Sequence, residues 1–221
     1  MTPEQVAGSP EPPLPPDAFR RLDETPDPAF YATPRFVAHI DEGAIAAVTR
    51  LYREHLPAGG AVLDLMSSWI SHLPPDIAYT RVVGLGMNAE ELAANPRLHA
   101  WTVHDLNAEP RLPFADEEFD GATCCVSIDY LVHPVAVLRD LARVLRPGGP
   151  LIVTFSNRRF PTKVIARWET LDDAGHAQLV RHYLREAGGW EDVVALDRSP
   201  EMGDPLFAVV ARRAGSKMSA A

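Results

Sequence analysis

The sequence predicts an α/β protein, built as a doubly wound, mostly parallel sheet of seven strands with helices on both faces. Short apolar runs alternate along the chain with segments whose apolar residues recur at helical spacing. The apolar runs have no polar face, which is typical of parallel strands that are covered on both sides. With 221 residues, the chain is long enough for one substantial domain.

The elements follow in order along the chain. A helix is expected at residues 41–55, where Ile45, Val48 and Leu51 share one face and Pro57 ends the pattern. Strands are then expected at residues 61–65, 81–85, 98–103, 119–128, 151–155, 193–196 and 206–211. Further helices are expected at residues 88–94, 134–145 and 172–187.

The two ends of the chain have a composition unlike that of a packed core. Four prolines between residues 12 and 16 disfavour a helix, and the last eight residues are small or polar. We therefore expect residues 1–28 to be a flexible N-terminal segment, residues 29–213 to be a single domain, and residues 214–221 to be a tail.

Composition and charge argue against several classes of function. A formal net charge of -9 disfavours binding to nucleic acid, because such binding needs Lys and Arg to neutralise phosphates. No apolar run has membrane-spanning length, and the N-terminus lacks the architecture of a signal peptide, so a cytoplasmic protein without a membrane partner is expected. Cys124 and Cys125 stand in an apolar run and are expected to be buried hydrophobes.

A ligand of such a sheet is expected beyond the carboxyl ends of the strands, near the point where strand order reverses. The residues that follow each predicted strand are therefore the candidates for a site. They fall in residues 64–72, 84–88, 104–107, 127–133 and 156–159.

Several short motifs occur in a telling order between residues 60 and 155. They are Val62-Leu63-Asp64-Leu65, Val82-Val83-Gly84, Asp105-Leu106, Leu112-Pro113-Phe114, Phe119-Asp120 and Leu145-Arg146-Pro147-Gly148-Gly149. In this order and spacing the chain resembles a class I S-adenosylmethionine (SAM)-dependent methyltransferase of the type 11 kind. The resemblance implies a Rossmann-like methyltransferase fold and SAM as the cofactor.

The resemblance also implies roles for particular residues. Asp64, at the end of the first strand, is expected to meet the amino-acid part of the cofactor. Asp105 is expected to accept a hydrogen bond from the adenine amino group, and Leu106 to offer its backbone amide to a ring nitrogen. Further candidates for cofactor binding are Met66, Ser67, Ser68, Gly86, Met87, Asn88 and Ser127.

The chain departs from the family pattern in two places. Met66, Ser68 and Ile70 stand where the family has three glycines. Gly86 stands where the family has a carboxylate for the ribose, so Asn88 is the candidate for that contact. These departures leave open an alternative, in which the fold survives as a binding or interaction module without catalysis.

A second alternative comes from a different motif. The residues from Gly84 to Ala89 satisfy the G-x-G-x-x-A fingerprint of dinucleotide-binding proteins, and Asp105 follows about twenty residues later. This pattern favours an NAD(P)-dependent oxidoreductase. The predicted helix that follows is short for such a unit, and the methyltransferase motifs continue downstream to Gly149.

Candidates for catalysis follow the fourth predicted strand. His133 has an unperturbed pKa near neutrality and is a candidate general base, with Asp129 and Tyr130 beside it in sequence. His133-Pro134 is equally consistent with a simple helix start.

The acceptor is expected to be a small molecule, held by Tyr31, Arg35, Asn157 and Arg158. Because the methyl donor is already activated, a base is needed only for a protonated acceptor. The acceptor atom and the oligomeric state are not encoded in any recognisable pattern, and His99, His104 and Asp105 do not have the spacing of a metal site.

Overall fold

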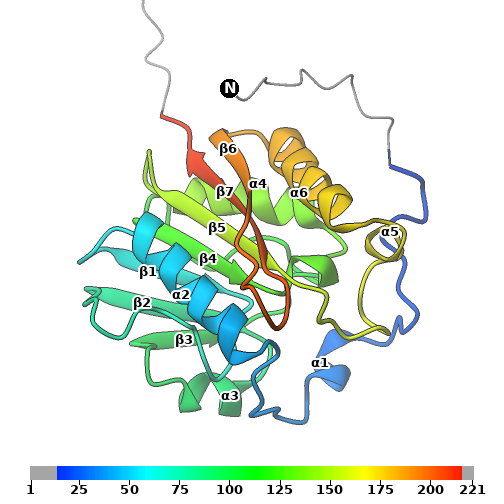
Figure 1. Ribbon diagram of the computed structural model, residues 1–221, viewed down its shortest axis with the longest axis horizontal. Coiled ribbons are helices and arrows are strands. Elements are labelled where there is room, and N and C mark those ends of the chain that lie inside the picture. Colours follow the sequence, from blue (N-terminus) through cyan, green and yellow to red (C-terminus); the bar gives the residue numbers. More distant parts are fainter. Residues whose placement is uncertain (1–13, 216–221) are drawn as a thin grey trace, which may run out of the picture.

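The structure is a computed structural model that describes residues 14–215. Seven strands form one sheet in the order β3-β2-β1-β4-β5-β7-β6 (Figure 1). The strands are β1 (Ala61–Leu65), β2 (Arg81–Gly86), β3 (Ala100–Val103), β4 (Gly121–Cys125), β5 (Pro150–Phe155), β6 (Trp190–Asp197) and β7 (Phe207–Arg213). Strands β1 to β5 pair in parallel, and β7 runs antiparallel to both of its neighbours. The predicted fold class is thus confirmed.

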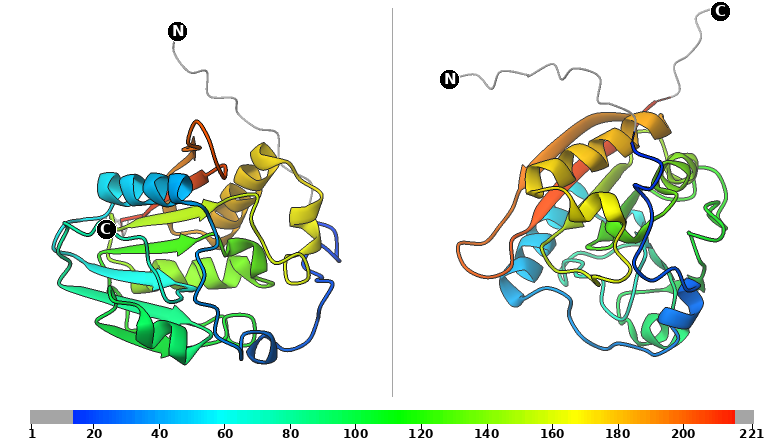
Figure 2. Two further views of the ribbon diagram at one scale, coloured as in Figure 1. Left: turned by 60° about the horizontal axis from the view of Figure 1, so that its bottom comes forward. Right: turned by 90° about the vertical axis from the view of Figure 1, so that its right-hand side faces the viewer.

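Helices cover both faces of this sheet (Figure 2). They are α1 (Asp27–Phe30), α2 (Glu42–His55), α3 (Ala89–Ala94), α4 (Pro134–Val144), α5 (Ala166–Glu169) and α6 (Asp173–Ala187), with a 3-10 turn, η1 (Ile128–Tyr130). Buried residues of α2 pack with Val62 and Ile152 on one face. Buried residues of α4 and α6 pack with Leu63 and Val153 on the other.

The long helices begin where the sequence supplies a cap. The side chain of Asp41 accepts a hydrogen bond from Ala44 N at the start of α2, and Asp172 does the same for Gly175 N at α6. Pro134 occupies the first turn of α4, where its missing N–H costs nothing. Helices α1 and α5 were not predicted, since four residues are too few to show a helical period.

The connection from β1 to β2 contains no helix: residues 66–80 form a loop instead. Side chains and backbone hold this loop in place. Thr49 Oγ1 on α2 donates to the carbonyl of His72, and Arg97 donates to the carbonyls of Pro74 and Ile77. The loop therefore approaches the sheet edge as a fixed element.

The N-terminal residues that the structure describes pack against the domain, which differs from the expected flexible segment 1–28. Ala18 is buried, and the ring of Phe19 lies 6.1 Å from that of Tyr183. Asp23 N donates to the carbonyl of Thr162. Residues 1–13 and 216–221 lie outside the described residues. Within residues 14–215, none of the helices has both the length and the apolar character that crossing a membrane requires.

Candidate functional site

A cavity of about 450 Å³ opens beyond the carboxyl ends of the parallel strands, at the switch point between β1 and β4. Figure 1 shows these strand ends directed toward the side of the molecule where α1 lies. The volume falls within the range of small-molecule sites. Most of the ligand-binding and catalytic candidates line it: Tyr31, Arg35, Met66, Ser67, Ser68, Gly86, Met87, Asn88, Asp105, Leu106, Ser127, Tyr130, Asn157 and Arg158. Asp64, Asp129 and His133 are not part of its lining.

Asp64 is buried below the cavity and is bound by three hydroxyl groups. Ser67 Oγ and Ser71 Oγ donate to its Oδ2 at 2.6 and 2.7 Å, and Thr123 Oγ1 donates to its Oδ1 at 2.9 Å. Burial raises the pKa of this carboxyl, and the hydroxyl hydrogen bonds oppose the shift. The carboxylate of Asp64 thus joins β1, β4 and the following loop, and its contact with the cofactor stays a prediction.

Ser67 and Gly86 bring the β1–β2 loop directly over the end of β2. Ser67 N donates to the carbonyl of Leu85 at 2.8 Å. A Cβ atom on Gly86 would lie 2.1 Å from the carbonyl oxygen of Ser67, a distance that real atoms do not tolerate. Glycine at residue 86 thus has a steric reason, which also explains why no carboxylate can stand there.

The backbone is strained on both sides of the switch point. Met66, directly after β1, has φ of 56°, and Val126, directly after β4, has φ of 43°. Left-handed backbone is rare for such side chains, above all for a β-branched one, and it persists only where the surroundings hold it. Both residues line the cavity. The loop after β1 therefore enters the left-handed conformation at Met66 without the family's glycines.

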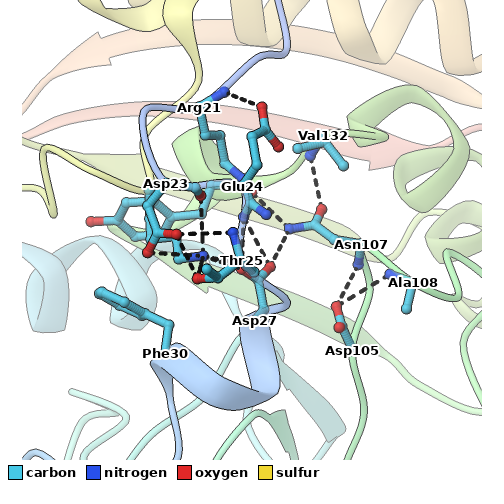
Figure 3. Close-up of polar contacts among 12 residues, drawn as sticks. Arg21, Asp23, Glu24, Thr25, Asp27, Phe30, Asp105, Asn107, Ala108 and Val132 are labelled. Carbon is cyan, nitrogen blue, oxygen red and sulfur yellow. Dashed lines mark hydrogen bonds and ion pairs between the residues drawn. The ribbon is translucent and has the colours of Figure 1, made fainter.

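Asp105 and Leu106 present complementary polar groups to the cavity. Asp105 Oδ1 accepts from the backbone N–H groups of Asn107 and Ala108 at 2.9 and 3.2 Å (Figure 3). Within residues 14–215, no hydrogen bond engages Asp105 Oδ2 or the backbone N–H of Leu106. One acceptor and one donor thus stand side by side without a protein partner.

Asn88 does not have the free side chain that the sequence suggested. Its Oδ1 caps α3 by accepting from Glu90 N and Glu91 N, and its Nδ2 donates to the carbonyls of Tyr31 and Ala32. These four hydrogen bonds use the whole capacity of an amide. The expected ribose contact is corrected accordingly.

Glu91 lies next to Asn88 and also lines the cavity. Its Oε1 accepts from Arg35 N at 2.7 Å, while Oε2 makes no described hydrogen bond. Burial raises the pKa of this carboxyl, against the hydrogen bond from Arg35. Glu91 thus supplies the cavity with an acceptor near the end of β2, although its sequence position indicated only a helix start.

An ion-paired network fastens the N-terminal segment beside the cavity. Figure 3 shows Asp27 receiving hydrogen bonds from Arg21 and from Asn107, at 2.8 Å each for the shortest contacts. Lys163, whose side chain is fully buried, lies 3.3 Å from Asp27 Oδ1 and 3.4 Å from Asp23 Oδ2. Burial raises the pKa of Asp27, but the hydrogen bonds outweigh burial and the net shift is downward.

Aromatic and cationic side chains form the opposite wall. The guanidinium of Arg35 lies 4.6 Å from the ring centre of Phe30 and 5.4 Å from that of Phe160. The His39 ring meets Phe160 edge-on at 5.4 Å. Tyr130 Oη accepts from Phe160 N at 2.9 Å, and burial raises the pKa of Tyr130.

Two of the three catalytic candidates lie outside this cavity, which corrects their predicted place. His133 is exposed and precedes α4, beside a neighbouring groove that shares Asp27, Asp105 and Asn107 with the cavity. Asp129 belongs to η1 and is buried, and burial raises the pKa of its carboxyl to about 7. Tyr130 alone lines the cavity.

Sequence analysis did not single out several lining residues. Glu91 falls within the helix predicted at residues 88–94, and His39 and Phe160 lie in loops that carry no periodic signal. Cys125 also lines the cavity, while its neighbour Cys124 is buried as expected; burial raises the pKa of the Cys125 thiol to about 11. Among residues 14–215, no group of three or more His, Cys, Asp or Glu side chains has the arrangement of a metal site.

Gly84, the first glycine of the dinucleotide fingerprint, serves packing. A Cβ atom there would lie 2.5 Å from the Leu98 side chain, so this glycine lets the chain before β3 lie close to β2. The fingerprint occupies the second strand of the sheet, and the helix after it spans only six residues. These features fit the crossover of a dinucleotide-binding unit poorly.

Comparison with known proteins agrees with this geometry. Residues 66–153 match the family model described as a methyltransferase domain. A demethylmenaquinone methyltransferase of Mycobacterium sp. (strain KMS) is 50% identical over 56 residues, which are 24% of each chain. One from Mycobacterium marinum (strain ATCC BAA-535 / M) is 44% identical over 61 residues, 28% of this chain and 25% of the relative.

Solved structures share the fold at low sequence identity. The crystal structure of the cyclase SpnF superposes with a TM-score of 0.61 at 18% identity, over 84% of this chain and 91% of that one. An S-adenosylmethionine-dependent methyltransferase from Mesorhizobium loti superposes with a TM-score of 0.54 at 15% identity, over 76% and 98%.

The strand order and the place of the cavity are those of the Rossmann-like methyltransferase fold, and residues 66–153 match the model of a methyltransferase domain. The chain spans about a quarter of the length of the curated relatives that it matches.

The cavity has the features that an adenosyl group requires. The free acceptor on Asp105 and the free donor on Leu106 suit the amino group and a ring nitrogen of adenine, and Met87 and Leu131 add apolar surface. Ser68 has a hydroxyl without a described partner, whereas the hydroxyl of Ser67 is used by Asp64. Trp69 donates to the carbonyl of Val37 and leaves the space beside Asp105 open.

Proposed function

We propose that the protein transfers a methyl group from SAM to a small-molecule acceptor. The observation that supports this most strongly is the unpaired acceptor and donor of Asp105 and Leu106 within a cavity at the switch point. SAM supplies a methyl group that is already activated by its positive sulfur. The protein then has to bind both partners, align them and exclude water.

The residues divide by position into two groups. Asp105 and Leu106 hold the adenine end, Glu91 takes the ribose role that Asn88 cannot take, and Ser68 faces the methionine end. Met66, Gly86, Met87 and Ser127 shape the cavity between them. The second group lies on the opposite wall, where Tyr31, Arg35, Asn157 and Arg158 bind the acceptor.

The acceptor has to enter between charged and aromatic side chains. Arg158 lies 3.8 Å from its nearest acidic partner, Asp204, so its guanidinium is only loosely paired. Among the described residues, the guanidinium of Arg35 has no carboxylate at ion-pair distance and donates only to backbone carbonyls, while its backbone N–H donates to Glu91. Both favour an acceptor that carries or develops negative charge. The similarity to demethylmenaquinone methyltransferases favours a menaquinone-like acceptor.

Isothermal calorimetry with SAM and with S-adenosylhomocysteine tests the proposal. We expect both to bind, and Asp105→Ala to weaken binding about 10- to 100-fold, as expected for a hydrogen bond to a charged group. Glu90→Ala is the matched control, since Glu90 is an exposed carboxylate near the cavity but outside its lining. Unchanged affinity in Asp105→Ala would remove the assignment of the adenine end.

The side chains of Asp64, Ser67 and Asn88 form hydrogen bonds within the protein and are not free for a ligand. This observation favours a second function. In that case the fold serves as a binding or interaction module without catalysis. Absence of binding to both ligands at millimolar concentration would favour this module over the enzyme.

A further inference from the structure

Two histidines, His39 and His104, line this cavity, and Nε2 of His104 already lies 2.8 Å from the carbonyl oxygen of Glu109. The ring of His39 lines the cavity and meets Phe160 at 5.4 Å, on the same wall as Arg35. Within residues 14–215, neither ring nitrogen of His39 takes part in a hydrogen bond. A ligand can therefore use a ring nitrogen without breaking a contact of the fold.

The charges around His39 keep its imidazole neutral. Burial, followed by the positive charge of Arg35, lowers the pKa of His39. From the β1–β2 loop His72 faces it, and burial together with His39 lowers the pKa of His72 to about 4. From the loop after β5, Arg158 and Arg159 share the cavity wall. Among the described residues, no carboxylate contributes to the pKa of His39, so at neutral pH the ring can accept a proton.

We propose that His39 is the general base of the reaction, and that it accepts the proton of a hydroxyl group carried on an aromatic ring of the acceptor. This inference rests on the proposed function and names the base and the acceptor class of the same site. It replaces His133, which lies outside the cavity.

The chemistry of the wall selects this acceptor class. A neutral imidazole is too weak a base for an aliphatic alcohol, but it matches a phenolic hydroxyl, whose pKa lies near 10 in tyrosine. Arg35 stands beside His39 and stabilises the phenolate that forms. The rings of Tyr31 and Phe160 offer apolar faces on which an aromatic acceptor can lie.

The step balances as follows. The O–H bond of the acceptor breaks, its electron pair remains on oxygen, and the proton moves to a ring nitrogen of His39. The oxygen forms a bond to the methyl carbon, the bond between that carbon and sulfur breaks, and its electron pair stays on sulfur. His39 then returns its proton to solvent, and no oxidant or reductant is needed.

The proton transfer can be measured without turnover by using 4-nitrophenol, whose anion absorbs visible light and whose neutral form does not. The probe is titrated with pH in the presence of excess protein saturated with S-adenosylhomocysteine. We expect the bound probe to ionise at lower pH than the free probe, with proton transfer to His39. His39→Gln should reduce affinity for the anion about tenfold or more and make the shift smaller, leaving the part that Arg35 contributes.

His133→Gln is the control, because this histidine lies outside the cavity and should leave the probe unaffected. His39→Asn is a second variant, and thermal melting of each variant reports whether it is folded. Equal probe ionisation in the parent and in both folded His39 variants would overturn the role of His39, and failure of the parent to bind the probe would overturn the acceptor class. Calorimetry with SAM on the same samples separates these outcomes from failure of the proposed function.

Discussion

Thr123 on β4 donates a 2.9 Å hydrogen bond to Asp64 on β1, across the point where the strand order reverses. Both residues are buried, and Ser67 and Ser71 complete the shell around the carboxylate. The two central strands and the loop between β1 and β2 are therefore joined by one acidic side chain. This connection maintains the floor of the cavity.

Thr123→Val should destabilise the protein by about 1–3 kcal/mol, because it leaves a buried carboxylate oxygen without its donor. Thr154→Val is the matched control on neighbouring β5. Thr154 is equally buried, and its hydroxyl has no hydrogen-bond partner beyond proximity to the Cys125 thiol. We expect that control to be neutral or slightly stabilising in urea denaturation. Equal losses in the two variants would contradict the role of the shell around Asp64.

Gly86→Ala should displace the β1–β2 loop, because its Cβ would meet the carbonyl oxygen of Ser67 at 2.1 Å. Overpacking of this kind costs about 1–3 kcal/mol, and it should also weaken binding of S-adenosylhomocysteine. Gly121→Ala is the control, since its nearest neighbour is a leucine side chain at 3.1 Å that can move. Calorimetry and thermal melting measure both effects. A Gly86→Ala protein with parental affinity would show that the loop does not shape the site.

Asp129→Asn should raise stability at neutral pH. The carboxyl of Asp129 has a pKa of about 7 in the folded protein, raised by burial from 3.8. The unfolded chain therefore ionises first, and the contribution of Asp129 to stability is full below pH 3.8 and is lost as pH rises toward 7. Removing the charge should recover up to about 4 kcal/mol above pH 7, an order-of-magnitude figure. Urea denaturation at several pH values between 4 and 8 measures the free energy of unfolding, which should change less with pH in the variant than in the parent. An equal pH dependence in the two proteins would refute the raised pKa of Asp129.

Lys163→Met should be strongly destabilising, by about 3–5 kcal/mol, because it removes a buried cation between Asp23 and Asp27 and leaves Asp27 paired with Arg21 alone. Arg53→Met provides the comparison, since Arg53 pairs with Asp76 on the surface and should cost less than about 1 kcal/mol. Denaturation in urea measures both. The double variant Lys163→Met with Asp27→Asn should lose less than the sum of the single losses. Simple additivity would argue against a coupled network.

Much of the fold could be predicted from the sequence, since apolar runs and helical spacing report burial directly. The strand that ends at Val103 and the turn at Gly148 follow from such local patterns. The environment of Asp64 could not be predicted, because one of its donors, Thr123, is distant in sequence. The environment of Asn88 could not be predicted either: its position indicated a ribose contact, but its amide donates to the carbonyl of Tyr31, and that contact depends on where the N-terminal segment returns.

The residues around the cavity also differ in whether local sequence can place them. Asp105 and Leu106 follow a strand directly, so their place at the sheet edge could be inferred from strand order. His39 and Glu91 could not be singled out, because a loop and a short helix orient them through contacts with Phe160 and Arg35. Local pattern therefore identifies the adenine end better than the acceptor end.

The route from β1 to β2 has a consequence for recognising related chains. A glycine-rich turn forms because its residues have no side chains. This loop is instead held by hydrogen bonds from the hydroxyls of Ser67 and Ser71 and from the indole of Trp69. A search by alternating glycines would pass over every chain built in this way. A pattern of a strand-end aspartate, serines three and seven positions later and a glycine closing the second strand would find them.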